Sequence, residues 1–126
     1  MPIKVLLADD SDVVRRAIRQ LLEEDPDIEL VGEAEDFAQM VEMTKDLKPQ
    51  IILLDLQMKD EVKATPVDIK SRLNDGARIV AMSFSNDEEA RVLAESFGAV
   101  AVLDKTELVD ELIPTIERYS SPSANA

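Results

Sequence analysis

Short runs of apolar residues alternate along the chain with longer segments in which apolar residues recur every three to four positions. A short, nearly all-apolar run is typical of a strand buried on both faces of a parallel sheet. The periodic segments are typical of helices that pack one face on such a sheet. Ile28–Ala34 instead alternates apolar and polar residues, which predicts an edge strand. The expected strands are Ile3–Ala8, Ile28–Ala34, Ile51–Leu54, Arg78–Met82 and Val100–Leu103.

Capping residues, prolines and one glycine set the ends of the expected helices. Ser11 and Asp36 can accept hydrogen bonds from free backbone N–H groups at a helix start, and Thr65-Pro66 places proline at a first helical position. Gly98 fits the left-handed position after a helix, whereas Pro114 lies inside one and should kink it. The expected helices run from Ser11 to Glu24, from Asp36 to Leu47, from Thr65 to about Leu73, from Asn86 or Asp87 to about Phe97, and from Glu107 to about Tyr119.

Strict alternation of strands and helices predicts an α/β fold with parallel strands and helices on both faces of the sheet. For five strands the common winding is the flavodoxin-like, doubly wound (βα)5 sandwich with strand order 2-1-3-4-5. A chain of 126 residues suits a single domain. We expect this domain to span residues 1–119, with residues 120–126 as a tail or a truncated linker.

Charge and missing residue types narrow the possible functions. The 27 acidic against 14 basic residues give a net charge of −13, which argues against direct nucleic-acid binding because that needs clustered Lys and Arg. No basic stretch suits a membrane surface, and no apolar run approaches the roughly 18 residues of a membrane span, so we expect a cytoplasmic protein. The chain contains no Cys and no His, which excludes disulfides, thiolate or imidazole metal sites, and Ser–His–Asp catalysis.

Polar residues with complementary chemistry follow four of the expected strands. Asp9-Asp10 follows the first strand, Asp55 the third, Ser83 the fourth and Lys105 the fifth. The carboxyl ends of parallel strands meet at one edge of the sheet, and ligands bind there where the strand order reverses. Three carboxylates should therefore converge, and their repulsion can be relieved by protonation, a basic neighbour or a cation. An all-oxygen set of ligands suits Mg²⁺.

This set of residues suits phosphoryl transfer onto a carboxylate. Asp55 would attack the phosphorus, Mg²⁺ and Lys105 would offset charge on the transferring oxygens, and Ser83 would hydrogen-bond one of them. Each residue alone also has an ordinary interpretation: helix capping for Asp9-Asp10, a turn for Asp55, a loop hydroxyl for Ser83 and a surface charge for Lys105. Their combination at four strand ends favours the functional interpretation.

Four motifs resemble those of response-regulator receiver domains. They are Leu-Leu-Ala-Asp-Asp-Ser at 6–11, Ile-Ile-Leu-Leu-Asp-Leu-Gln-Met at 51–58, Ala-Met-Ser at 81–83 and Gly-Ala-Val-Ala-Val-Leu-Asp-Lys at 98–105. The resemblance covers residues 3 to about 119. Within it, Leu21–Ala34 resembles the subfamily that often carries a C-terminal helix-turn-helix output domain.

The resemblance implies that Asp55 is the phosphoacceptor of a two-component phosphorelay. The other implied roles are metal ligation and phosphoryl binding, with Asp10, Asp55 and the Gln57 backbone carbonyl as direct Mg²⁺ ligands, Asp9 acting through water, and Ser83 and Lys105 on the phosphoryl group. The implied donor is the phosphohistidine of a sensor histidine kinase or a histidine phosphotransfer protein. Such a chain is a signalling phosphoacceptor rather than an enzyme, and a phosphorylation-dependent homodimer is one expected output.

Three departures from the family pattern put the usual output mechanism in question. Met58 is followed by Lys59 where family members usually have proline, and the segment Lys59–Ala64 is charged and lacks the usual glycine. Val102 stands where Tyr or Phe is common, so no aromatic ring can rotate inward as the usual switch. Phe84 stands where many receivers carry a small side chain. It could shield the phosphoryl group from water or pack as ordinary apolar cover.

Three other hypotheses remain at this point. The chain could be an atypical receiver that serves as a phosphorylation-independent protein-interaction module, which Val102 and the charged loop favour. It could be a small-molecule phosphatase of similar fold, because Asp10 and Asp12 have the spacing of that active site, although substrate-covering segments are missing. A flavin carrier fits less well because no Ser/Thr/Gly-rich phosphate loop follows the first strand.

Overall fold

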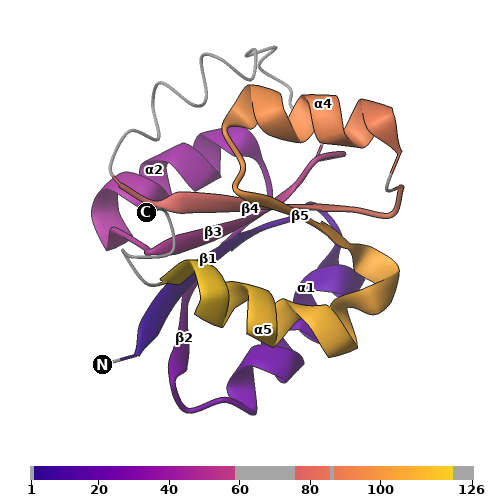
Figure 1. The fold of residues 1–126 in the computed structure, drawn as a ribbon. Coiled ribbons are helices and arrows are strands. Elements are labelled where there is room, and N and C mark those ends of the chain that lie inside the picture. Colours follow the sequence, from indigo (N-terminus) through magenta and orange to yellow (C-terminus); the bar gives the residue numbers. More distant parts are fainter. Residues whose placement is uncertain (1, 59–75, 86, 121–126) are drawn as a thin grey trace.

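The computed structural model describes residues 2–58, 76–85 and 87–120, which form a sheet covered by helices on both faces (Figure 1). All strand pairs are parallel and the order is β2-β1-β3-β4-β5. The strands are β1 (Ile3–Ala8), β2 (Ile28–Ala34), β3 (Ile51–Asp55), β4 (Arg78–Ser83) and β5 (Ala101–Asp104). The predicted doubly wound α/β fold is confirmed, including the place of β2 at an edge.

Among the described residues, two pairs of helices enclose the sheet. Within the described residues, no helix is both long enough and apolar enough to cross a membrane. One pair, α1 and α5, covers one face, and the other pair, α2 and α4, covers the opposite face (Figure 1). The helices are α1 (Asp12–Glu23), α2 (Phe37–Leu47), α4 (Glu88–Phe97) and α5 (Leu108–Ser120), with a 3-10 turn η1 (Lys105–Glu107) before α5.

Alternating strand side chains fill two hydrophobic cores, one on each face of the sheet. Leu7 and Leu53 belong to the core beneath α1 and α5, and Leu6 and Leu54 belong to the core beneath α2 and α4. All four side chains are completely buried. Burial on both faces explains why the central strands are nearly all apolar.

Several element ends differ from the expectation by one residue, and two of these differences matter for function. β3 and β4 extend to Asp55 and Ser83 because the ladder continues, with Asp55 opposite Met82 and Ser83 opposite Asp104. Both polar side chains are thus held by strand backbone rather than by a loop. The helix expected from Thr65 to Leu73 and the charged segment at 59–64 lie outside the described residues.

The edge strand β2 contains one residue more than the stretch of β1 with which it pairs. Val5 lies opposite Leu30, but Leu6 lies opposite Gly32, so the register shifts at Val31. Such a bulge reverses the faces of the residues that follow it. Gly32 therefore faces α2, where an added Cβ would lie 2.9 Å from Cδ1 of Leu47.

The end of α5 is joined to the start of β4. Arg78 donates a hydrogen bond from Nη1 to the backbone carbonyl of Tyr119 at 2.6 Å. The helix continues past Pro114 and ends at Ser120. Since β4 begins at the amino edge of the sheet and η1 follows β5 at the carboxyl edge, α5 spans the whole sheet between the two edges.

Candidate functional site

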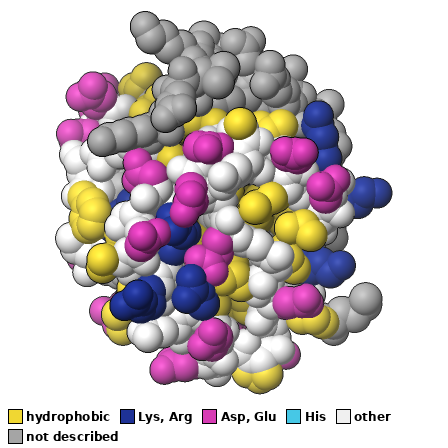
Figure 2. Space-filling view, turned by 180° about the vertical axis from the view of Figure 1, so that it is seen from behind, with side chains coloured by type: hydrophobic (Ala, Val, Ile, Leu, Met, Phe, Trp, Pro, Cys, Tyr) yellow, Lys and Arg dark blue, Asp and Glu magenta, His cyan; other side chains and the backbone are white. Residues whose placement is uncertain are grey.

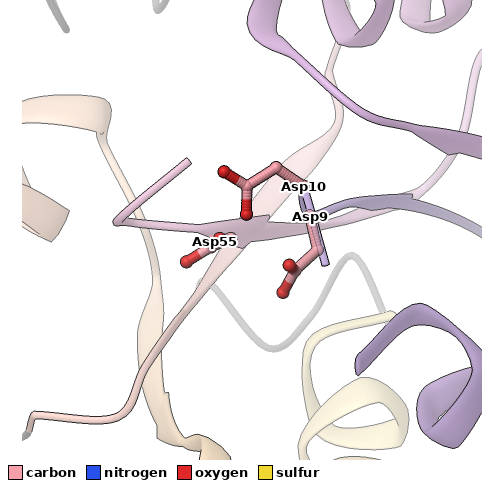
Figure 3. Close-up of side chains that lie close together, drawn as sticks. All are labelled: Asp9, Asp10 and Asp55. Carbon is pink, nitrogen blue, oxygen red and sulfur yellow. The ribbon is translucent and has the colours of Figure 1, made fainter. Parts of the chain in front are cut away.

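The residues singled out at the strand ends meet at the carboxyl edge of the sheet. Asp9 and Asp10 follow β1 and Asp55 ends β3, and these two strands are neighbours. Each of the three aspartates contributes a carboxylate oxygen to a group of atoms that all lie within 4.8 Å of one another (Figure 3). Asp9 and Asp55 are buried, whereas Asp10 is exposed. The cluster thus combines the buried carboxylates of Asp9 and Asp55 with the solvent-exposed carboxylate of Asp10.

Lys105 bridges the two buried carboxylates. Its Nζ lies 2.7 Å from Oδ2 of Asp9 and 3.1 Å from Oδ1 of Asp55, and its side chain is only 4% exposed. Oδ2 of Asp9 has this ammonium as an ion-pair partner, yet it accepts no well-directed hydrogen bond from the described residues. Lys105 therefore pairs with two of the three carboxylates, and Oδ2 of Asp9 accepts no directed hydrogen bond from the described residues.

The environment of Asp55 opposes its ionisation. Burial raises the pKa of the Asp55 carboxyl above its usual value, and the negative charge of Asp9 raises it further. The backbone N–H of Gln57, which donates to Oδ1 of Asp55 at 2.9 Å, and the ammonium of Lys105 act in the opposite direction. A positive charge bound beside the three aspartates would favour the ionised carboxylate.

Two further predicted residues lie beside the aspartates. Ser83 is buried, and its Oγ accepts a hydrogen bond from the backbone N–H of Ser85 at 3.1 Å, so its own hydroxyl hydrogen remains available to donate. Ser83 and Gln57 line the same shallow pocket. The side chain of Gln57 is exposed, and metal ligation by its backbone carbonyl stays a prediction.

Phe84 covers the lysine of the site. Its ring centroid lies 5.1 Å from Nζ of Lys105, within the range of a cation–π contact. The Phe84 side chain is 56% exposed although it lies next to buried Ser83. Ordinary core packing would bury the ring, so this position favours a role in covering the site.

One residue that contacts the acidic pair was not anticipated from the sequence. Arg15 of α1 is buried, and its Nη1 donates to the backbone carbonyl of Asp9 at 2.7 Å. The sequence places Arg15 beside the apolar residues of α1 but does not show that it is buried. The pattern of apolar residues also does not show which residues of β2 face this helix.

The cluster fits a hard cation in chemistry and in charge. Its ligand atoms are carboxylate oxygens from Asp9, Asp10 and Asp55, which is the donor type that Mg²⁺ prefers. Oδ2 of Asp9 accepts no directed hydrogen bond from the described residues, and burial together with the charge of Asp9 raises the pKa of Asp55; a bound cation would satisfy the first and offset the second.

Comparison with known proteins agrees with this geometry. Residues 5–117 match the response regulator receiver domain family. The chain is 38% identical over 120 residues to the transcriptional regulatory protein LiaR of Bacillus subtilis, covering 94% of this chain and 56% of LiaR. It is 35% identical over 120 residues to the nitrate/nitrite response regulator protein NarL of Escherichia coli, covering 95% of this chain and 56% of NarL. The chain thus spans about half the length of these relatives.

Solved structures share the fold. The response regulator domain of Thermotoga maritima CheB superimposes with a TM-score of 0.80 at 22% identity, over 95% of this chain and 97% of that domain. This likeness supports the fold alone, whereas the sequence match over residues 5–117 supports the family. The chain belongs to the response regulator receiver family, the phosphoacceptor domains of two-component signalling.

Proposed function

We propose that Asp55 accepts a phosphoryl group from the phosphohistidine of a sensor histidine kinase or a phosphotransfer protein, in a reaction that depends on Mg²⁺. The observation that carries this proposal is the Lys105 ammonium between two buried carboxylates, 2.7 Å from Asp9 and 3.1 Å from Asp55. A buried lysine beside a buried aspartate with a raised pKa is an arrangement that functional sites use and that ordinary surfaces avoid.

The nucleophile is an oxygen of Asp55. Its Oδ1 receives both the Gln57 N–H and the Lys105 contact, which leaves Oδ2 as the oxygen without a protein donor among the described residues. In the transfer, Oδ2 forms a bond to phosphorus while the bond between phosphorus and the histidine nitrogen breaks. The leaving imidazole keeps the electron pair, and Asp55 becomes an acyl phosphate.

Neighbouring residues support the attack by offsetting the negative charge on the transferring oxygens. Asp9, Asp10, Asp55 and the Gln57 carbonyl would hold the cation, which supplies positive charge next to the transferring oxygens. Lys105 adds a second positive charge from a side chain that is already desolvated. The hydroxyl of Ser83 can donate to a phosphoryl oxygen while its Oγ keeps the Ser85 N–H bond.

The consequence of phosphorylation is a change in a protein-interaction surface. Lys105 and Ser83 lie at the carboxyl ends of β5 and β4, so movement of either toward the phosphoryl group displaces the loops before α5 and α4. Val102 offers no ring to couple these movements, and the change should therefore be modest. One expected result of this surface change is a homodimer that forms on phosphorylation. Light scattering would test it by measuring the molar mass before and after phosphorylation.

The central experiment is phosphorylation with acetyl phosphate. The unmodified protein should gain one acid-labile phosphoryl group by intact mass spectrometry with Mg²⁺ and none with EDTA. Asp55→Asn should abolish the gain, whereas Asp46→Asn, at an exposed position of α2, should not change it. Labelling of Asp55→Asn at the normal rate would disprove the site assignment. An unmodified protein that takes up no phosphoryl group would instead favour the phosphorylation-independent interaction module.

A further inference from the structure

Arg15 is a buried cation next to Asp9 and Asp10. Its side chain is 9% exposed, although it belongs to the first turns of α1. Nη1 donates to the backbone carbonyl of Asp9, and the rest of the guanidinium faces three carboxylates, those of Asp12, Glu33 and Glu35. A guanidinium has five N–H donors in one rigid plane, so these contacts on several sides fix its orientation.

The partners of Arg15 come from two different elements. Asp12 begins α1 and is contacted by Nη2, which also lies 3.2 Å from Oε1 of Glu35, just after β2. Nε lies 3.6 Å from Oε1 of Glu33 in β2. The same Glu33 receives two hydrogen bonds from Arg19, each 2.8 Å long. Arg15 is therefore anchored to a β2 segment that is itself held against α1.

The hydrogen bond to Asp9 acts on the peptide that precedes Asp10. The Asp9 carbonyl belongs to the planar unit that joins these two residues, so fixing this oxygen fixes the direction in which the chain enters Asp10. Two other polar groups of Asp9 are also hydrogen-bonded: its N–H donates to the backbone carbonyl of Ala34 at 3.0 Å, and its Oδ1 accepts from the Ser11 N–H at 2.9 Å. Arg15 supplies the restraint on the Asp10 side.

We infer that Arg15 is a positioning residue of the Mg²⁺ site, which holds the Asp9–Asp10 peptide so that Asp10 presents its carboxylate to the cation. This inference rests on the proposed function. Charge and geometry predict effects of opposite sign. The guanidinium is positive and repels Mg²⁺, so loss of its charge alone would tighten metal binding. Loss of positioning would weaken it.

The test compares Arg15→Gln with Arg19→Gln by calorimetric titration of the full chain with MgCl₂. Both changes remove an arginine that joins α1 to Glu33, but only Arg15 contacts Asp9. Groups that orient metal ligands typically contribute 10- to 100-fold to affinity, and we expect Arg15→Gln to raise the Mg²⁺ dissociation constant about 10-fold. Arg19→Gln should leave it within about twofold of the unmodified value. Far-UV circular dichroism confirms that each variant is folded at the titration temperature.

Arg15→Lys gives a second measurement that keeps the positive charge. A single ammonium cannot hold the Asp9 carbonyl and the carboxylates of β2 together, so positioning predicts weaker Mg²⁺ binding here too, and this variant decides the question if Arg15→Gln does not fold. Equal or tighter binding by the folded Arg15 variants would overturn the inference, as would an equal weakening by Arg19→Gln. An unmodified protein that binds no Mg²⁺ would overturn the proposed function itself.

Discussion

Replacing Phe84 with alanine should shorten the lifetime of phosphorylated Asp55. The ring lies 5.1 Å from Nζ of Lys105, and the Lys105 side chain beneath it is 4% exposed. Removing the ring exposes the ammonium and the neighbouring acyl phosphate to water, and exclusion of water is what protects a reactive intermediate. Phe84 is itself 56% exposed, so its truncation should cost little stability and the comparison is made between folded proteins.

The contact between Phe84 and Lys105 sets the expected size of the effect. A cation–π contact at an exposed site contributes about 0.5–1 kcal/mol, which corresponds to a factor of about 2–5 in a rate constant. If Lys105 holds the phosphoryl group less firmly by this amount, hydrolysis should accelerate about 2–5-fold. Easier entry of water would add to this factor.

The assay follows decay of the phosphoprotein after the phosphoryl donor is removed, with intact mass spectrometry at fixed Mg²⁺. Phe84→Leu keeps much of the volume but has no aromatic ring, so it separates shielding from the cation–π contact. Val109→Ala, at a 77% exposed position of α5, is the matched control and should not change the decay. The Mg²⁺ affinity of Phe84→Ala should be unchanged. An unchanged or longer lifetime in Phe84→Ala would show that the ring is packing and not a cover.

Three further outcomes are expected. Mg²⁺ at 100 times its dissociation constant should stabilise the protein by about 2.7 kcal/mol. With an unfolding entropy of about 2.1 cal/mol/K per residue over 126 residues, this corresponds to a rise of about 10 °C in the melting temperature in a thermal scan. Asp10→Asn should remove most of this rise. Without metal, Asp55→Asn should melt higher than the unmodified protein at pH 7. The pKa of Asp55 is raised in the folded state, so its protonated form favours folding. This stabilisation is present below the unfolded pKa of about 3.9 and is lost as pH rises through the folded pKa, whereas the neutral Asn side chain does not lose it. Equal melting temperatures at pH 7 would contradict this. Beryllofluoride should alter hydrogen exchange modestly in α4 and the loop before it, because charge-assisted hydrogen bonds contribute about 1.5–3 kcal/mol each; changes confined to the loop after Asp55 would refute this route.

The fold and most of the site could be predicted because parallel sheets convert sequence position into spatial position. A residue at the carboxyl end of any strand must lie at the same edge as its counterparts, so Asp9, Asp10, Asp55 and Lys105 could be placed together without knowledge of any distance. The structure adds what this rule does not contain. The rule does not show that Lys105 contacts both buried carboxylates.

The role of Arg15 could not be predicted for a definite physical reason. Its partner Glu33 faces α1 only because the bulge at Val31 shifts the register of β2, and strict alternation from Ile28 would have placed Glu33 on the α2 face. A bulge of one residue leaves little trace in a pattern of apolar and polar residues. Contacts that depend on it, such as the pairs of Glu33 with Arg15 and Arg19, become visible only in three dimensions.

Helix α5 connects the edge of the sheet that carries the aspartates with the opposite edge. β4 has six residues, which at about 3.3 Å each places the two edges of the sheet roughly 20 Å apart. Lys105 and η1 lie at the acidic edge, while the far end of α5 is pinned to the start of β4 through Tyr119 and Arg78. Because α5 is continuous between the two edges, a displacement of Lys105 would be transmitted along the helix toward Tyr119. A change at the phosphoryl site would therefore reach the surface around Arg78 and Tyr119, at the edge of the sheet opposite the three aspartates.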